Sequence, residues 1–212
     1  MATDLLEIDP EHPKPEAIER AAAEIRRGRV VAIPTDALYA LVADPFNLGA
    51  VAGVFRAKGR ESHRSLPLLI GDTLAAEELA AELTNRFYIL ARRFWPGPLT
   101  VIVPASARVP LKVTGNTGRL ALRHSRAAIV NALIAYLNQP LICTSANISS
   151  HPTCRSGIEV FGVMDGRVDL VLDGGACTGG GATTVDITDP VWKIIKQGGI
   201  EGKEIAEALA PA

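Results

Sequence analysis

The sequence contains little of what marks several large classes of protein. It has three cysteines, at positions 143, 154 and 177, and no two of them form a CxxC pair. An odd number of widely spaced cysteines argues against both a disulfide framework and a zinc site. No apolar run approaches the roughly 18 residues of a membrane span, and the acidic N-terminal segment lacks the apolar core of a secretion signal. We therefore expect a reduced, cytoplasmic protein that has no membrane partner.

The chain also lacks an excess of charge of either sign. Lys and Arg total 22 and Asp and Glu total 23, which gives a formal net charge of -1. Such a chain has no general attraction for nucleic acid or membrane, so a polyanion must be bound by a local patch. Hydrophobic residues make up 48% and charged residues 21%, as in ordinary globular proteins. Because no repeat, low-complexity segment or Pro/Gly/Ser-rich linker divides the sequence, we expect one domain over residues 1–212.

Helix-like and strand-like patterns alternate along the whole chain. The clearest helix is predicted in residues 15–28, where apolar residues recur on one face between Pro15 and Gly28. Further helices are predicted in residues 47–59, 75–95 (as one helix or two), 127–138 and 201–210, and strands in residues 29–34, 66–70, 99–104, 118–123, 140–145, 168–175, 183–188 and 192–199. The pattern, about eight strands and five or six helices, predicts an α/β fold on a twisted, mixed sheet.

Positive charge gathers in residues 55–65, although the chain as a whole is nearly neutral. Lys58 and Arg60 flank Gly59, and Arg64 follows with His63 beside it. Lysine carries a mobile point charge and arginine a rigid two-pronged donor, so together they suit a phosphate or a carboxylate. Glycine between them permits a tight turn or the close approach of a ligand. The alternative is a solvated loop after a helix C-terminus, where cations are favourable in any case.

Polar side chains also stand where two predicted strands end. Thr35 and Asp36 follow the buried strand in residues 29–34, and Tyr39 comes within one turn of them. They could line a site, or Thr35 or Asp36 could simply cap the next turn. Arg119 and Arg123 lie four residues apart in the predicted strand 118–123, so they share one face of it. For Arg123, at the strand end, a ligand-binding role is favoured over a structural one.

A third group of polar side chains ends the predicted strand in residues 140–145. Thr144, Ser145 and Asn147 could bind a phosphate, a ribose or a carboxylate, or they could form a local turn. No GxSxG frame makes Ser145 a hydrolase nucleophile. The glycine-rich segment 173–186 matches neither the P-loop nor the GxGxxG pattern, so it predicts neither of these nucleotide-binding folds.

These segments, in this order, resemble the YrdC-like family of threonylcarbamoyl-AMP synthases. The matching motifs are Pro34-Thr35-Asp36 with Tyr39, Lys58-Gly59-Arg60, Phe94 to Thr100, Leu120 to Arg123, Ser145-Ala146-Asn147, Val168 to Gly175, Thr183 to Asp186, and Ile194 to Gly198. The resemblance covers roughly residues 14 to 205. It implies a YrdC-like α/β fold with a concave, basic cavity. It also implies a nucleotidyltransferase that makes threonylcarbamoyl-AMP and pyrophosphate from threonine, bicarbonate and ATP, for a modified adenosine in tRNA.

The resemblance also implies roles for individual residues. Lys58 and Arg60 would be catalytic and would hold the phosphates of ATP. The full ATP-binding set would be Lys58, Arg60, Ser145, Asn147, Thr153 and Lys196, and the threonine-binding set Thr35, Tyr39, Arg123, Cys143 and Thr144. Mg2+ would accompany ATP, with no metal-ligating residues expected in the chain. Implied partners are tRNA or double-stranded RNA and a downstream tRNA threonylcarbamoyl transferase complex.

The chain departs from the family pattern at several positions. Ala40 and Val42 replace glycines, Glu61 replaces a proline in a longer loop, and a histidine usual just after the Pro-Leu pair is missing. Ala182 replaces a serine, and Lys196 replaces an arginine, which keeps the charge and loses the fork. Two alternatives therefore stay open. One is an RNA-binding module without synthase activity, in which Arg92, Arg93, Arg119, Arg123 and Arg126 form a phosphate-binding patch. The other is a paralogue that acts on a different carbamoyl-adenylate.

Overall fold

The computed structural model describes residues 2–210, which form eleven strands and eight helices. The strands are β1 (Asp4–Glu7), β2 (Val31–Ile33), β3 (Ala40–Val42), β4 (Leu68–Leu69), β5 (Leu99–Pro104), β6 (Arg119–Arg123), β7 (Leu141–Ile142), β8 (Thr144–Ser145), β9 (Leu170–Asp173), β10 (Thr183–Asp186) and β11 (Lys193–Lys196). The helices are α1 (Pro15–Arg26), α2 (Leu48–Lys58), α3 (Thr73–Leu79), α4 (Asn85–Phe94), α5 (Leu111–Thr114), α6 (Ala128–Leu137), α7 (Gly157–Met164) and α8 (Gly202–Ala208). Every helix and strand expected from the sequence has a counterpart among them.

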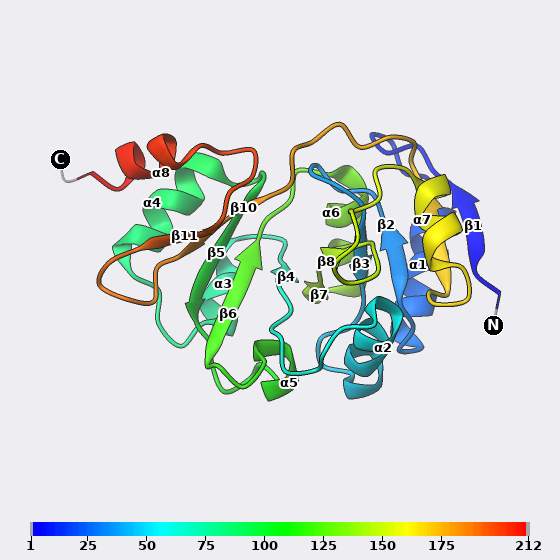
Figure 1. Cartoon of the computed structure of the whole chain (residues 1–212), viewed down its shortest axis with the longest axis horizontal. Helices are drawn as coiled ribbons and strands as arrows, with labels where there is room; N and C mark the ends of the chain where they lie inside the picture. The colour runs from blue at the N-terminus through cyan, green and yellow to red at the C-terminus, as the bar shows by residue number, and fades with distance from the viewer. Residues whose placement is uncertain (1, 211–212) are drawn as a thin grey trace.

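The strands form two sheets that lie beside each other, seen in the right and left halves of Figure 1. One sheet has five strands in the order β1-β9-β2-β3-β8, and the other has six in the order β11-β10-β5-β6-β4-β7. Both are mixed. In the five-stranded sheet β2 runs parallel to β9 and antiparallel to β3, and in the six-stranded sheet β5 runs parallel to β10 and antiparallel to β6. The twisted, mixed α/β arrangement expected from the sequence is therefore confirmed, divided between two sheets.

The two sheets are joined where the predicted strand 140–145 breaks at Cys143. Its first part, β7, pairs with β4 in the six-stranded sheet, whereas its second part, β8, pairs with β3 in the five-stranded sheet. A single apolar run therefore crosses from one sheet to the other. This crossing places Thr144 to Asn147 between the sheets, directly after a buried strand.

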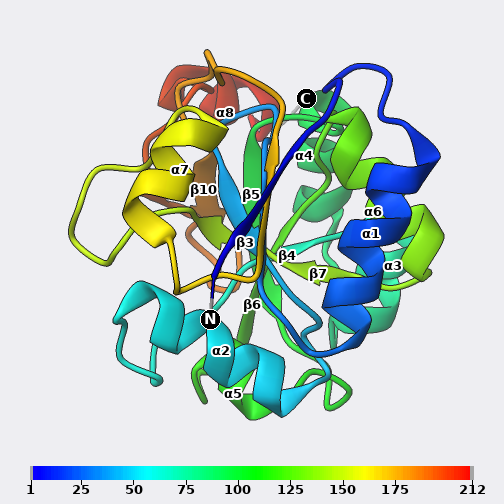
Figure 2. The same ribbon diagram turned by 90° about the vertical axis from the view of Figure 1, so that its right-hand side faces the viewer.

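Helices cover the outer faces of both sheets. On the five-stranded sheet, α1 and α6 lie side by side (Figure 2) and bury Ile18, Ile25, Ile129 and Leu133 against the strands. The face of α1 predicted from the sequence is confirmed, since its apolar residues are at most 4% exposed. On the six-stranded sheet, α4 and α8 pack together on the side away from the other sheet (Figure 1). A larger buried cluster takes residues from both sheets. One domain over residues 1–212 stays a prediction.

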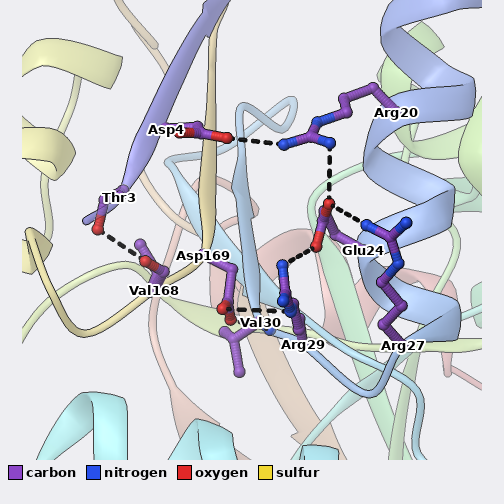
Figure 3. Close-up of polar contacts among 9 residues, drawn as sticks. All are labelled: Thr3, Asp4, Arg20, Glu24, Arg27, Arg29, Val30, Val168 and Asp169. Carbon is purple, nitrogen blue, oxygen red and sulfur yellow. Dashed lines mark hydrogen bonds and ion pairs between the residues drawn. The ribbon is translucent and has the colours of Figure 1, made fainter. Parts of the chain in front are cut away.

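A polar cluster around Glu24 ties the N-terminal strand to this framework (Figure 3). The carboxylate of Glu24 is 1% exposed and forms ion pairs with Arg20, Arg27 and Arg29 at 3.1, 2.9 and 2.7 Å. Arg20 also pairs with Asp4 of β1 at 2.7 Å. A buried carboxylate is tolerated only when it is paired and hydrogen-bonded, and here three guanidinium groups meet that need. The cluster thus fixes α1 relative to β1.

Four elements were not expected from the sequence: β1, β3, α5 and α7. The two strands have four and three residues and the helix α5 has four, which is too short for a clear periodic pattern. The expected count of about eight strands was low because β1 and β3 were missed and because the predicted strand 140–145 is two strands, β7 and β8. None of the helices in residues 2–210 has the length and apolar character needed to span a membrane.

Candidate active site

A cavity of about 570 Å³ lies between the two sheets. Strands β5, β6, β10 and β11 of the six-stranded sheet contribute one wall, and β3, β8 and the loops beside them contribute another. All eleven residues to which the sequence assigned ATP or threonine line this one cavity: Thr35, Tyr39, Lys58, Arg60, Arg123, Cys143, Thr144, Ser145, Asn147, Thr153 and Lys196. The fold therefore brings together segments that are more than 150 residues apart in the chain.

The lining of the cavity is strongly cationic. Five of the described lining residues are Lys or Arg, and none is Asp or Glu: the cations are Lys58, Arg60, Arg64, Arg123 and Lys196. A larger groove, of about 1040 Å³, lies between β1 and α1, but its lining includes Asp4, Glu7, Asp9, Glu16 and Asp173. Carboxylates repel an anionic nucleotide, so the cationic cavity between the sheets is the better candidate site.

Lys58 is the last residue of α2, and the backbone places its ammonium inside the cavity wall. Gly59 ends the helix in the left-handed conformation, with φ of +59°. The ammonium donates to the carbonyl of Ser145 at 2.5 Å, and to the carbonyl and Oδ1 of Asn147 at 3.1 and 2.9 Å. Lys58 is 3% exposed, yet every partner within its reach is a neutral oxygen. Its positive charge is therefore uncompensated by any described carboxylate.

Burial, together with the nearby guanidinium of Arg60, lowers the pKa of Lys58 to about 8. Burial likewise lowers the pKa of Arg60. The Nε of Arg60 is buried without a hydrogen-bond partner among the described residues, while its Nη atoms reach Thr144 Oγ1 at 3.5 Å and the Ser65 carbonyl at 3.2 Å. A bound anion would stabilise both charged groups, so this pair favours the anion-site hypothesis over a solvated loop.

The pKa of Lys58 predicts opposite pH dependences for ATP binding and for stability. Binding of an anion needs the charged ammonium, so ATP affinity should fall about tenfold per pH unit once the pH exceeds about 8. Stability of the unliganded protein should instead rise between about pH 8 and 10.5, because there the unfolded chain binds more protons than the folded one. Calorimetric ATP titrations and denaturant melts between pH 7 and 10 measure both. Equal slopes in wild type and Lys58→Met would contradict the assignment.

Ser145 and Asn147 are held in a network with Lys58. The Ser145 hydroxyl donates to Asn147 Oδ1 at 2.6 Å, and the Asn147 amide donates to the carbonyls of Ile148 and His151 at 2.9 and 2.6 Å. The network fixes the orientation of both side chains before any ligand arrives, as preorganisation requires. Thr153 and Lys196 lie farther along the lining, and no hydrogen bond occupies either side chain among the described residues.

Arg123 ends β6 and is oriented by two acceptors. Its Nε donates to the Gly97 carbonyl at 3.2 Å and its Nη2 to Asp36 Oδ1 at 2.5 Å, with both side chains of the ion pair 6% exposed. Ser125 also donates to Asp36 Oδ1. The remaining Nη1 has no partner among the described residues and Arg123 lines the cavity, so one donor group stays available for a carboxylate.

Two residues of the predicted threonine set use their polar atoms inside the protein. The Thr35 hydroxyl donates to the Leu38 carbonyl at 2.7 Å and accepts from the Ala37 amide. Tyr39 is fully buried; its hydroxyl donates to the Gly175 carbonyl at 2.8 Å and accepts from the Gly174 amide, and burial raises its pKa. Both residues therefore shape the cavity wall and leave little hydrogen-bonding capacity for a ligand.

The other two residues of that set lie at the crossing between the sheets. Cys143 is a free thiol whose pKa is raised by burial, although Arg123 lowers it in part. Thr144 is 6% exposed and accepts from Arg60. Both side chains line the cavity beside the cations, so they are placed to contact a ligand.

Two residues considered from the sequence lie outside the cavity lining. His63 is 73% exposed and lies 3.5 Å from Glu61, so it is a loop residue rather than a replacement for the missing histidine. Arg119 pairs with Asp186 at 2.8 Å and with Asp189 at 3.3 Å. Arg119 and Arg123 therefore both form ion pairs within the protein. These are two of the five arginines proposed for an RNA-binding patch.

Sequence reasoning missed two groups of residues in the site. It treated Asp36 as part of a motif or as a cap, and it did not foresee that this carboxylate orients Arg123 across the cavity. It also passed over Thr100 and Thr184, which line the cavity on neighbouring strands. The signal for Thr100 was its position between the apolar residues Leu99 and Val101, which points its side chain to the opposite face of the sheet. Thr184, between Thr183 and Val185, carried no such signal.

The fold and the cavity together define an α/β protein with a cationic cavity between its two sheets. A model of the Sua5–YciO–YrdC family, described as "Telomere recombination", matches residues 23–198. The chain belongs to this family, as the motifs predicted.

Curated relatives carry the name threonylcarbamoyl-AMP synthase. The protein of Pyrococcus abyssi is 35% identical over 193 residues, which cover 91% of this chain and 57% of the relative. That of Halorhodospira halophila is 35% identical over 165 residues, which cover 78% of this chain and 86% of the relative. The chain thus spans a little over half of the Pyrococcus abyssi protein and most of the Halorhodospira halophila protein.

Solved structures show the same fold. Pyrococcus abyssi Sua5, in a crystal structure of its complex with L-threonine, has 34% sequence identity and a TM-score of 0.94, covering 98% of this chain and 61% of that one. Escherichia coli YciO has a TM-score of 0.89 at 23% identity and covers 96% of this chain and 99% of that one, a likeness of fold alone.

Proposed function

We propose that this chain makes threonylcarbamoyl-AMP and pyrophosphate from L-threonine, bicarbonate and ATP. The observation that carries the proposal is a pair of cations without a carboxylate partner, the buried Lys58 and the half-buried Arg60, which share one cavity with the oriented guanidinium of Arg123. The pair suits phosphates, and the guanidinium suits the carboxylate of an amino acid. The names of the curated relatives and the L-threonine bound by Pyrococcus abyssi Sua5 support the choice of amino acid.

The residues of the cavity match the chemistry of this reaction. The amine of threonine and bicarbonate (or CO2) give a carbamate, whose oxygen attacks the α-phosphorus of ATP while the bond to pyrophosphate breaks. No covalent intermediate with the protein is needed, so the chain contributes positioning and charge stabilisation. Lys58 and Arg60 would neutralise phosphate charge, while Ser145 and Asn147 would hold the phosphate or sugar region.

Lys196 and Thr153 would complete the ATP-binding set, since both line the same cavity. Mg2+ would enter with ATP. Within residues 2–210 no cluster of three or more His, Cys, Asp or Glu side chains is arranged to hold a metal ion. Mg2+ commonly takes phosphate oxygens and water as ligands when it binds with a nucleotide, and it would do so here.

The product would be consumed by a tRNA threonylcarbamoyl transferase complex. Direct contact with tRNA or double-stranded RNA is a second candidate function. Arg92, Arg93 and Arg126 favour it, because all three are exposed and none forms an ion pair with a described residue. Such a contact would add to the synthase activity rather than replace it.

The direct test is pyrophosphate release from ATP by the purified chain. We expect release to depend on L-threonine and bicarbonate together, and omission of either to reduce the rate at least about tenfold, because the carbamate is the nucleophile. Mass spectrometry of the products should identify threonylcarbamoyl-AMP. ATP turnover that does not depend on threonine would contradict the proposal. It would favour the alternative that this chain is a paralogue acting on another carbamoyl-adenylate.

A further inference from the structure

Four cavity-lining residues stand in one row across the six-stranded sheet. Thr184 of β10 is paired in register with Thr100 of β5 on one side and with Lys196 of β11 on the other. Val101 of β5 pairs with Leu122 of the antiparallel strand β6, so the next residues along the two strands, Thr100 and Arg123, lie beside each other. The order across the four strands is thus Arg123, Thr100, Thr184, Lys196, and all four line the cavity.

The two threonines in the middle of the row direct their side chains into the cavity. Their neighbours on the chain are fully buried and pack on the other face of the sheet; these are Leu99, Val101, Thr183 and Val185. Because side chains alternate along a strand, Thr100 and Thr184 face the cavity. Neither hydroxyl has a hydrogen-bond partner among residues 2–210, in contrast to Thr183, whose hydroxyl donates to the Ile200 carbonyl at 2.8 Å.

The surroundings leave room for a ligand over these hydroxyls. Gly181 and Ala182 line the cavity just before Thr184, and both have small side chains without polar atoms. In the next row of the same face, Ala121 and Ile102 are opposite each other and are also apolar. The two hydroxyls are therefore polar groups on an otherwise apolar floor, between a guanidinium and an ammonium.

The distance between adjacent strands relates the positions of Thr100 and Thr184 to the amino acid that Arg123 would hold. Adjacent strands lie about 4.8 Å apart, and the guanidinium of Arg123 is fixed on the carbonyl of Gly97, three residues before Thr100. An amino acid whose carboxylate binds Arg123 would extend its β-carbon and substituents over Thr100 and Thr184. A hydroxyl both donates and accepts, so two adjacent threonine hydroxyls can satisfy both needs of a substrate hydroxyl.

We propose that Thr100 and Thr184 recognise the β-hydroxyl of the amino-acid substrate and so select threonine over amino acids of the same size without a hydroxyl. The inference rests on the proposed function and assigns the specificity of that site. Thr35, whose hydroxyl is already engaged with Leu38 and Ala37, shapes the wall beside this subsite. A site that offers hydrogen bonds to a substrate hydroxyl discriminates strongly against an analogue that lacks it, because its own polar groups are then left unpaired.

The test compares L-threonine with L-2-aminobutyrate, which differs only by lacking the hydroxyl. Calorimetry in the presence of a non-hydrolysable ATP analogue gives the ratio of the two dissociation constants without relying on turnover. We expect wild type to prefer threonine by about 30-fold or more, Thr100→Val and Thr184→Val each to reduce that preference about 5- to 10-fold, and the double variant to lose it. Valine keeps the shape and the β-propensity of threonine.

Three further measurements keep the outcomes separate. Thr184→Ser retains the hydroxyl and should stay within about threefold of wild type, whereas Thr73→Val, on α3 outside the cavity, should change nothing. Affinity for the ATP analogue should stay within about threefold in all variants. A double variant that still prefers threonine, or a wild type without preference, overturns the inference; absence of threonine-dependent pyrophosphate release with the preference intact overturns the proposed function instead.

Discussion

Replacement of Lys58 by methionine should weaken ATP binding about 100-fold. The ammonium lies in the cavity wall with only neutral oxygens around it. A bound anion would therefore interact with the full positive charge of Lys58. A hydrogen bond to a charged group contributes about 1.5–3 kcal/mol, or about 10- to 100-fold in affinity. The upper end is expected here because Lys58 also holds Ser145 and Asn147 in place, and both of these belong to the proposed ATP site.

Calorimetric titration with ATP measures this loss, and Arg60→Gln should show a smaller loss in the same direction, because Arg60 is engaged with Thr144 and Ser65. Lys112→Met is the matched control: Lys112 is exposed on α5 and does not line the cavity. Thermal melts check that each variant is folded. Unchanged ATP affinity in both cavity variants would mean that residues 55–65 are a solvated loop after all.

Local patterns allowed the sequence to predict most of the elements. The helix at residues 15–28 has a proline at its start, a glycine after its end and one apolar face, so each signal points to the same structure. The predicted segment 75–95 proved to be two helices, α3 and α4. The strand predicted at 140–145 was divided between two sheets, because pairing with β4 and β3 is a long-range property that an apolar run does not encode.

The same distinction applies to the site. Motif residues such as Lys58, Arg60 and Ser145 could be predicted because they stand at the ends of elements, and all of them line one cavity. What could not be predicted was how side chains pair across it. The contact of Asp36 with Arg123 joins residues 87 apart in the chain, and the row of Thr100 and Thr184 depends on register between strands. Both follow from tertiary packing, not from local sequence.

Replacement of Arg123 by alanine should have two large effects, one on stability and one on threonine binding. It leaves the carboxylate of Asp36 buried without its cationic partner, and Asp36 Oδ2 already has no hydrogen-bond partner among the described residues. Breaking a buried ion pair by removing one partner costs about 3–5 kcal/mol. For a chain of this size the melting temperature should therefore fall by about 6–20 °C. Threonine affinity should fall about 30- to 1000-fold, as expected for loss of a buried charged hydrogen bond.

The double variant Asp36→Asn/Arg123→Ala separates these two effects. It removes the isolated buried charge, so it should regain about 1–3 kcal/mol of the free energy of unfolding, whereas threonine binding should stay lost because no guanidinium faces the cavity. Arg119→Ala is the matched control, since Arg119 lies on the same strand and pairs with Asp186 and Asp189 outside the cavity lining. It should lower stability and leave threonine affinity unchanged. Denaturant melts and threonine titrations below the melting temperature measure all three variants. If the double variant recovers threonine binding together with stability, Arg123 only supports the fold, and another group must hold the carboxylate.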